Sequence, residues 1–234
     1  MLCGMLAATG IAGQPQSFFH RPDQRDWARG LGLRQDAPLG DVLSAVRATA
    51  TNGLCGIRLQ QHSHAYLMQT LADYGDTDPD RIEHAFGPTT YIWLRREDKL
   101  AQAISVLRAQ QTGLWHRGAD GSDLERLTPI QPDGYSIDSI AAQIKAFKQA
   151  DRAWLHWFCD HRIAPCPVTY EALCETLEPT MFRLLINLNL PLEQVDRAIA
   201  DTIPVPTKKL ADAISDTWSG RYRHEVLAKR GESP

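Results

Sequence analysis

The sequence predicts an α/β fold in which a parallel sheet is flanked by helices. Three short apolar segments, residues 53–59, 89–95 and 164–170, have the composition of buried strands. The stretches between them carry helical periodicity, and strands that alternate with helices pair in parallel. Three strands are few for a sheet of this kind, so we expect a further strand outside the given sequence.

Composition and charge favour a single cytoplasmic domain over residues 1–234. A chain that is 43% hydrophobic and 23% charged is long enough to bury one sizeable core. A net charge of -3 gives no reason to expect nucleic acid as a partner. No apolar run approaches the roughly 18 residues of a membrane span, and the N-terminus lacks the features of a signal peptide. The five cysteines are odd in number and lack a Cys-x-x-Cys pair, which indicates reduced thiols.

The chain opens on a predicted helix. One face carries Met1, Leu2, Met5, Leu6 and Thr9 at the spacing of an apolar helical stripe. Gly10 follows where a helix C-terminal glycine belongs. The sequence therefore begins inside a packed helix.

Helices and one strand are expected between this opening and residue 86. They are a short helix around Trp27, helices over 40–52, 62–74 and 78–86, and a buried strand over 53–59. In the last of these helices, Asp78 is the predicted N-cap and Pro79 occupies the first helical position.

The segment "TTYIWLR" (89–95) has the strongest strand composition in the sequence and runs directly into a helix. Leu100, Ile104 and Leu107 form the apolar stripe of that helix. The pattern predicts a strand, tight turn and helix in one continuous unit. Residues 116–134 are rich in glycine, proline and polar residues, so we expect a mobile loop there.

A long helix over 137–160 and a third strand over 164–170 follow the loop. The inward positions of the long helix are Ile137, Ile140, Ile144, Phe147, Trp154 and Phe158. The remainder is helical, with Pro204 and Pro206 marking a loop before a basic, tryptophan-containing helix over 215–229.

Four segments together resemble a known family. They are "AATGIAGQPQSFF", "LRREDKLAQAISVLRAQQTGLW", "CPVTYEALC" and "SDTWSGRYR". In this order and spacing they are similar to the trehalose 2-sulfotransferase family of bacterial carbohydrate sulfotransferases, from Leu2 to about residue 227, most specifically over 94–115. The resemblance implies a P-loop-type α/β fold, 3'-phosphoadenylyl sulfate (PAPS) as sulfate donor, and transfer of its sulfuryl group to a hydroxyl. Trehalose, a glycolipid sugar or a lipopolysaccharide sugar would be the acceptor, and a homodimer is possible.

The resemblance also gives a reading of the opening helix. In the family, a first strand and a loop rich in Ser, Gly, Arg and Thr precede this helix, and its N-terminus holds the phosphosulfate. Both would lie immediately before Met1. Either an internal methionine or a trimmed chain explains this start, or the protein lacks the loop. We expect residues 1–234 alone to bind PAPS weakly and to transfer no sulfate.

The resemblance assigns the cofactor's 3'-phosphate to Arg96, at the end of the strand over 89–95, and to Ser105 in the next helix. Arg95 is the nearest substitute for Arg96. A guanidinium offers a planar fork of donors, and a serine hydroxyl adds one more to the same phosphate. Without the resemblance, these residues would read as a solvated arginine pair and an exposed helix serine.

The loop "GQPQSFF" (13–19) aligns with the acceptor side of the family site. Relatives usually carry an acidic residue, proposed as the base, at the position of Ser17, and the neutral Gln14 lies three residues earlier. A serine hydroxyl is not an effective base near neutral pH without its own activator, so that role does not carry over. His20, Asp23 and Asp26 lie close by and could supply a base. His20 is the best candidate because its unperturbed pKa lies near neutrality, and a polar surface histidine is the alternative.

Arg58 and Trp115 complete the candidate ligand contacts. Arg58 stands where relatives commonly have lysine after the second strand, and Trp115 follows the phosphate-binding helix. His62 and His64 form a His-x-His pair, but residues two apart on a helix point in different directions and no third ligand follows at metal spacing. We therefore expect no metal site.

Two questions stay open at this point. Trp218 and Tyr222 on the last helix could cover a sugar or an adenine, although packing is the commoner role of aromatic residues at helical spacing. The altered Ser17 also leaves an alternative function, that of a non-catalytic relative that binds adenosine 3',5'-bisphosphate (PAP), PAPS or a sugar without turnover.

Overall fold

The computed structural model describes residues 1–117, 122–128, 134–202 and 213–230. The chain divides into two compact units. The first unit comprises Met1–Leu94 and Trp154–Pro204, and the second comprises Arg95–Ala153 and Val205–Pro234.

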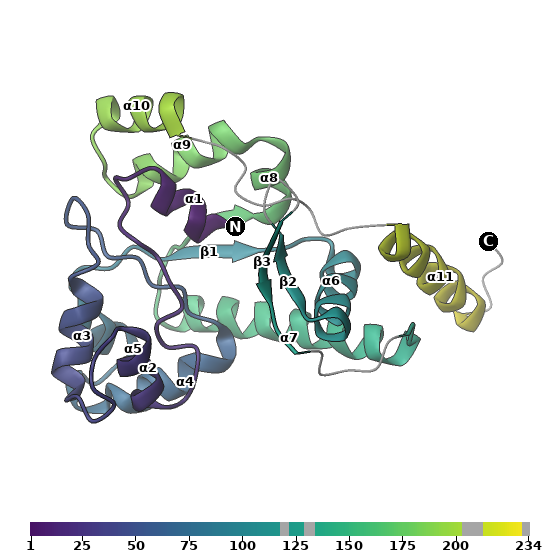
Figure 1. Cartoon of the computed structure of the whole chain (residues 1–234), viewed down its shortest axis with the longest axis horizontal. Helices are drawn as coiled ribbons and strands as arrows, with labels where there is room; N and C mark the ends of the chain where they lie inside the picture. Colours follow the sequence, from purple (N-terminus) through teal and green to yellow (C-terminus); the bar gives the residue numbers. More distant parts are fainter. Residues whose placement is uncertain (118–121, 129–133, 203–212, 231–234) are drawn as a thin grey trace. The chain divides into compact units, whose positions relative to one another are not determined.

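The first unit holds a small parallel sheet of two strands, β1 (Ile92–Arg95) and β4 (Cys166–Thr169). The Cys166 N–H donates to the Tyr91 carbonyl at 2.8 Å, just before β1 begins. Figure 1 shows helices on both sides of β1. These helices are α1 (Leu2–Ala8), α2 (Gln24–Gly30), α3 (Leu39–Arg47), α4 (Gln61–Thr70), the 3-10 turn η1 (Ala72–Tyr74), α5 (Asp78–Phe86), α8 (Tyr170–Glu175), α9 (Leu177–Asn187) and α10 (Leu192–Thr202).

Side chains alternate across the β1 segment, so it contributes to two cores. Tyr91 packs with the helices α2 to α5, in a cluster centred on Phe19 and Trp27. Ile92 packs on the opposite side, with α1, β4, α8, α9 and α10. Figure 1 shows the same division, with α2 to α5 on one side of β1 and α1, α8, α9 and α10 on the other.

The second unit contains α6 (Lys99–Thr112), the antiparallel pair β2 (Leu114–Arg117) and β3 (Asp123–Arg126), most of α7 (Ile137–Asp160) and α11 (Ala213–Arg230). Its core is formed by Ala103, Ile104, Leu107, Ile140 and Trp218. Lys99, nearly buried, joins α6 to α7 through an ion pair with Asp151 at 2.5 Å between Nζ and Oδ2.

Most predicted elements are confirmed within a few residues, including the parallel sheet, the opening helix, the strand and helix over 89–112, and the long helix. Leu2, Met5 and Leu6 are buried as expected, and Gly10 adopts a φ of +67°. Pro204 and Pro206 lie outside the described residues. The strand expected upstream of Met1 stays a prediction.

Four local predictions are wrong. Residues 53–59 form no strand, because positive φ angles at Asn52 and Gly53 turn the backbone and leave only single bridges, Thr51 with Leu54 and Ile57 with Gln16. The helix expected over 40–52 ends at Arg47, and Thr77 rather than Asp78 caps α5, through a capping box with Asp80. The segment 116–134 contains β3 and the end of β2, while 118–121 and 129–133 lie outside the described residues.

Candidate functional site

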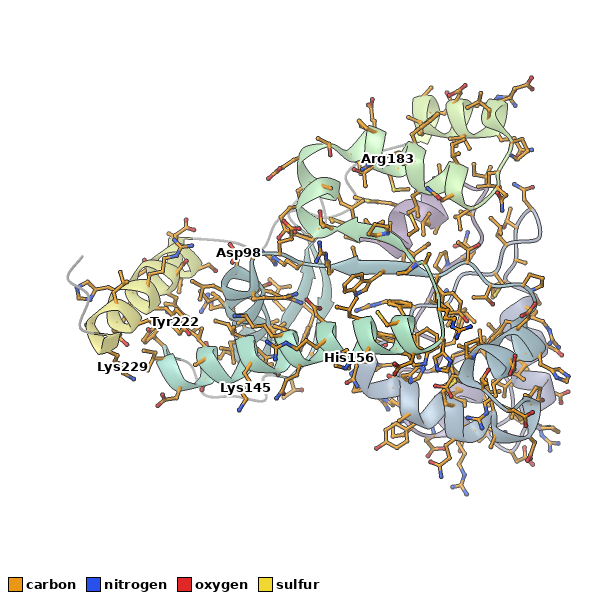
Figure 2. All side chains as sticks on the ribbon, turned by 180° about the vertical axis from the view of Figure 1, so that it is seen from behind. Asp98, Lys145, His156, Arg183, Tyr222 and Lys229 are labelled. Carbon is orange, nitrogen blue, oxygen red and sulfur yellow. The ribbon has the colours of Figure 1, made fainter. Side chains whose placement is uncertain are left out.

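The candidate phosphate-binding residues lie on the continuous unit β1–α6. Arg95 is the last residue of β1, and Arg96 follows it in the turn. Asp98 ends this turn, because its carboxylate accepts from the Ala101 N–H at 2.8 Å and so caps α6. Figure 2 labels Asp98 at this position. The cap fixes the start of α6, so Arg95, at the end of β1, and Arg96, in the short turn, lie just before this helix.

Both arginines and Ser105 are half-buried. The Arg95 Nη2 lies 3.4 Å from the Glu97 Oε1, and Ser105 lies in the second turn of α6, seven residues after Asp98. Seven residues are two helical turns, so Ser105 is on the same side of α6 as its N-cap. The unit thus offers guanidinium and hydroxyl donors suited to a phosphate.

The loop around Ser17 belongs to the first unit and approaches a neighbouring backbone closely. Gly13 has a φ of +71°, and a Cβ at this position would overlap the carbonyl oxygen of Leu54. A Cβ on Gly56 would likewise overlap the Pro15 ring. Only glycine therefore allows the loop to lie against residues 54–56 in this way.

Ser17 is half-buried, whereas Gln14 and His20 are exposed. The Ser17 hydroxyl accepts from the Gln60 Nε2 at 3.4 Å, and Gln60 is the N-cap of α4. The candidate loop and the start of α4 are therefore adjacent.

His62 is the residue that sequence reasoning missed as part of this group. Its ring packs edge-on against the ring of His20, with centroids 5.3 Å apart. Burial, followed by the charges of His20 and Arg58, lowers the pKa of His62. The structure thus brings His20, Arg58 and Ser17 together around the first turn of α4. The contact between the two histidines spans a long stretch of sequence, and no local pattern indicated it.

His64 has a different environment from His62, as expected for residues two apart on a helix. Its ring contacts Trp154 and Trp157, and its Nε2 lies 3.5 Å from the Asp78 Oδ2. Burial lowers the pKa of His64, although the Asp78 carboxylate opposes this shift. Within the described residues, no three His, Cys, Asp or Glu side chains form a group that could hold a metal ion.

Trp115 lies on β2 in the second unit and is half-buried. Trp218 is buried in the core of that unit, with the Arg108 guanidinium 5.6 Å from its ring centroid, and Tyr222 packs against the same core. Packing is therefore the observed role of the two aromatic residues of α11. In the part of the chain that the structure describes, no helix is long and apolar enough to cross a membrane.

Comparison with known proteins shows the family of this chain. The sequence model of the Stf0 sulphotransferase family matches residues 1–225, which include the described residues of both units up to Glu225. A trehalose 2-sulfotransferase of Mycobacterium tuberculosis is 27% identical in an alignment 255 positions long, which covers 97% of this chain and 90% of the relative. A trehalose 2-sulfotransferase of Mycolicibacterium smegmatis is 26% identical with the same coverage. This chain belongs to the Stf0 sulphotransferase family.

Proposed function

We propose that this protein transfers a sulfuryl group from PAPS to a hydroxyl of a carbohydrate or glycolipid. The observation that supports this best is the β1–α6 unit, which carries Arg95, Arg96 and Ser105 within the region matched by the sulphotransferase family. Both relatives are named trehalose 2-sulfotransferases, so trehalose is the first acceptor to test. A glycolipid sugar and a lipopolysaccharide sugar follow it as candidates.

The residues of the β1–α6 unit fit a phosphate-bearing donor. Arg96 and Ser105 would hold the 3'-phosphate, which PAPS and PAP share, with Arg95 beside them. When bound, PAPS supplies a sulfuryl group that is already activated as an anhydride with phosphate. The half-buried position of both guanidiniums strengthens their attraction for a dianion relative to fully exposed arginines.

On the acceptor side, Gln14, Ser17, Arg58 and Trp115 are the proposed contacts, and His20 is the candidate base named from sequence. The proposed location is the cytoplasm, because the five cysteines are odd in number and lack a Cys-x-x-Cys pair. A homodimer stays a prediction.

The test uses protein purified from its source organism through a C-terminal tag on the chromosomal gene, so that the gene itself sets the N-terminus. Intact mass then establishes where the chain begins. Sulfate transfer from isotopically labelled PAPS is measured with trehalose and with a panel of glycolipid and lipopolysaccharide sugars, and PAP binding is measured by calorimetry.

Arg96→Ala should weaken PAP binding by at least about 1.5 kcal/mol, or about tenfold, because a charge-assisted contact is lost. Arg152→Ala is the matched control, since Arg152 is an exposed arginine on α7 of the same unit. Unchanged affinity of the Arg96 variant would remove this residue from the site. Tight PAP binding without transfer to any acceptor would instead support the non-catalytic alternative.

A further inference from the structure

The start of α4 runs alongside the candidate acceptor loop, residues 16–20, and is joined to it by three hydrogen bonds. These are Arg58 N–H to the Gln16 carbonyl at 2.9 Å, Gln60 Nε2 to Ser17 Oγ at 3.4 Å, and Ser63 Oγ to the His20 carbonyl at 3.1 Å. The Ser63 side chain is buried, so this last contact is shielded from water. Residues 58–63, which we call the α4 entry, therefore keep a fixed register with the loop.

His62 emerges from the α4 entry beside His20. The rings meet edge to face at 5.3 Å, with an interplanar angle of 79°. His62 is exposed, so a substrate can reach its ring. The titratable and charged neighbours that act on it are His20, from the loop, and Arg58, from the α4 entry. Partial burial lowers the pKa of His62, and the charges of His20 and Arg58 lower it further because they disfavour a positive charge on the His62 ring.

The chemistry at Ser17 requires a proton acceptor from elsewhere. The Ser17 hydroxyl is not an effective base near neutral pH, and it is already engaged by Gln60. A histidine that is neutral near pH 7 is suited to general-base catalysis, and a ring held on the first turn of a helix is better positioned than one on a loop.

We propose that His62 is the general base that takes the proton of the acceptor hydroxyl, with His20 and Arg58 as positioning residues. This assignment rests on the proposed function. The acceptor O–H proton moves to a neutral ring nitrogen of His62 as the oxygen forms a bond to the sulfuryl sulfur. The bond from sulfur to the phosphate oxygen of PAPS breaks, and PAP leaves with that electron pair. The proton on His62 then passes to water.

The proposal is tested in the chromosomally tagged protein with trehalose or, if trehalose is not sulfated, the best acceptor of the panel. His62→Gln should lower kcat by at least about 100-fold, the lower range for loss of a general base, while PAP affinity stays within threefold. His156→Gln is the control and should leave kcat unchanged, because His156 is exposed on α7 of the same unit (Figure 2).

The pH profile of kcat/KM separates the base from its neighbour. Activity should rise with pH as His62 loses its proton, with a midpoint below that of an ordinary histidine. His20→Gln should move this midpoint upward, because one charge that lowers the pKa of His62 is gone. In the His62→Gln background, Ser17→Glu should raise kcat at least about tenfold, because a carboxylate then lies beside the acceptor.

Each outcome decides the assignment. A kcat of the His62→Gln variant within threefold of the wild-type value overturns the assignment and leaves the proposed function standing. A 100-fold loss of kcat in His20→Gln without such a loss in His62→Gln has the same meaning. Wild-type protein that transfers sulfate to no acceptor overturns the proposed function and this assignment with it. An NMR titration of the His62 ring in the wild type gives a check that needs no variant, because a midpoint different from the kinetic one also overturns the assignment.

Discussion

Trp157→Phe tests the polar network around Asp78 in the first unit. The Asp78 carboxylate accepts from the Trp157 Nε1 at 3.0 Å, pairs with the Arg81 Nη1 at 3.2 Å and lies 3.5 Å from the His64 Nε2. It also lies in the first turn of α5, where negative charge is favourable. The substitution keeps an aromatic ring but removes the N–H donor of α7.

The expected cost follows from the contacts. A hydrogen bond to a charged group contributes about 1.5–3 kcal/mol, and the Arg81 guanidinium that remains paired with Asp78 places this case near the lower end. The smaller ring also loses packing against Tyr91, Trp154 and Phe158, whose ring centroids lie 5.4–5.8 Å away. At about 25 cal/mol per Å², a loss of about 40 Å² adds about 1 kcal/mol. The free energy of unfolding should therefore fall by about 2–3 kcal/mol.

The assay is urea unfolding of the full chain, followed by far-UV circular dichroism and fluorescence, whose transitions must coincide. A double-mutant cycle with Asp78→Ala isolates the pair and should give a coupling energy of about 1.5 kcal/mol. Trp154→Phe is the control, because Trp154 shares ring contacts with His64 and Phe158 while no hydrogen bond from its Nε1 is found in the described residues. A Trp157–Asp78 coupling below about 0.5 kcal/mol, or an equal coupling for Trp154, would refute the reasoning.

Two further predictions concern stability. Because burial lowers the pKa of His64 more than Asp78 raises it, the unfolded chain binds a proton more readily. The free energy of unfolding should fall as pH drops below about 6.5, and His64→Gln should reduce this slope between pH 7.5 and 5.5; an unchanged slope contradicts the assignment. Gly13→Ala should be more destabilising than Gly10→Ala by at least about 1 kcal/mol in urea unfolding, because both have positive φ but only Gly13 would place a Cβ on Leu54. Equal losses would mean that the backbone approach is not tight.

The elements that could be predicted from the sequence are those whose signal is local and long. The α7 helix spans 24 residues with one apolar face, and β1 and α6 follow each other with matching strand and helix periodicity. Residues 53–59 are apolar enough for a strand, yet the positive φ angles of Asn52 and Gly53 and the close packing of Gly56 on Pro15 favour irregular backbone. Local composition does not reveal which neighbour a segment will meet, and that neighbour decided its conformation.

The residues of the candidate site likewise fall into those that a local stretch of sequence could indicate and those that only the fold brings together. Arg95, Arg96 and Ser105 lie within one short stretch of sequence, so the resemblance could assign them together. In the structure they lie on β1, on α6 and in the turn between them. The association of His62 with His20 depends on contacts such as that of Ser63 with His20, which joins residues 43 positions apart. A histidine two residues from another invited a metal interpretation, although the two rings have separate neighbours. Only the fold shows which of them meets the loop.

The loop around Ser17 is shaped mainly by its backbone. Gly13, Gly56 and the bridge from Gln16 to Ile57 hold the loop against the preceding segment, and none of these contacts involves the Ser17 side chain. A substitution there changes the available chemistry and alters the contact with Gln60, while the hydrogen bonds of the Gln16 and His20 carbonyls with the α4 entry remain. His62 would therefore stay beside the loop when the residue at position 17 changes, because the contacts of its neighbour Ser63 and of its own ring are with His20.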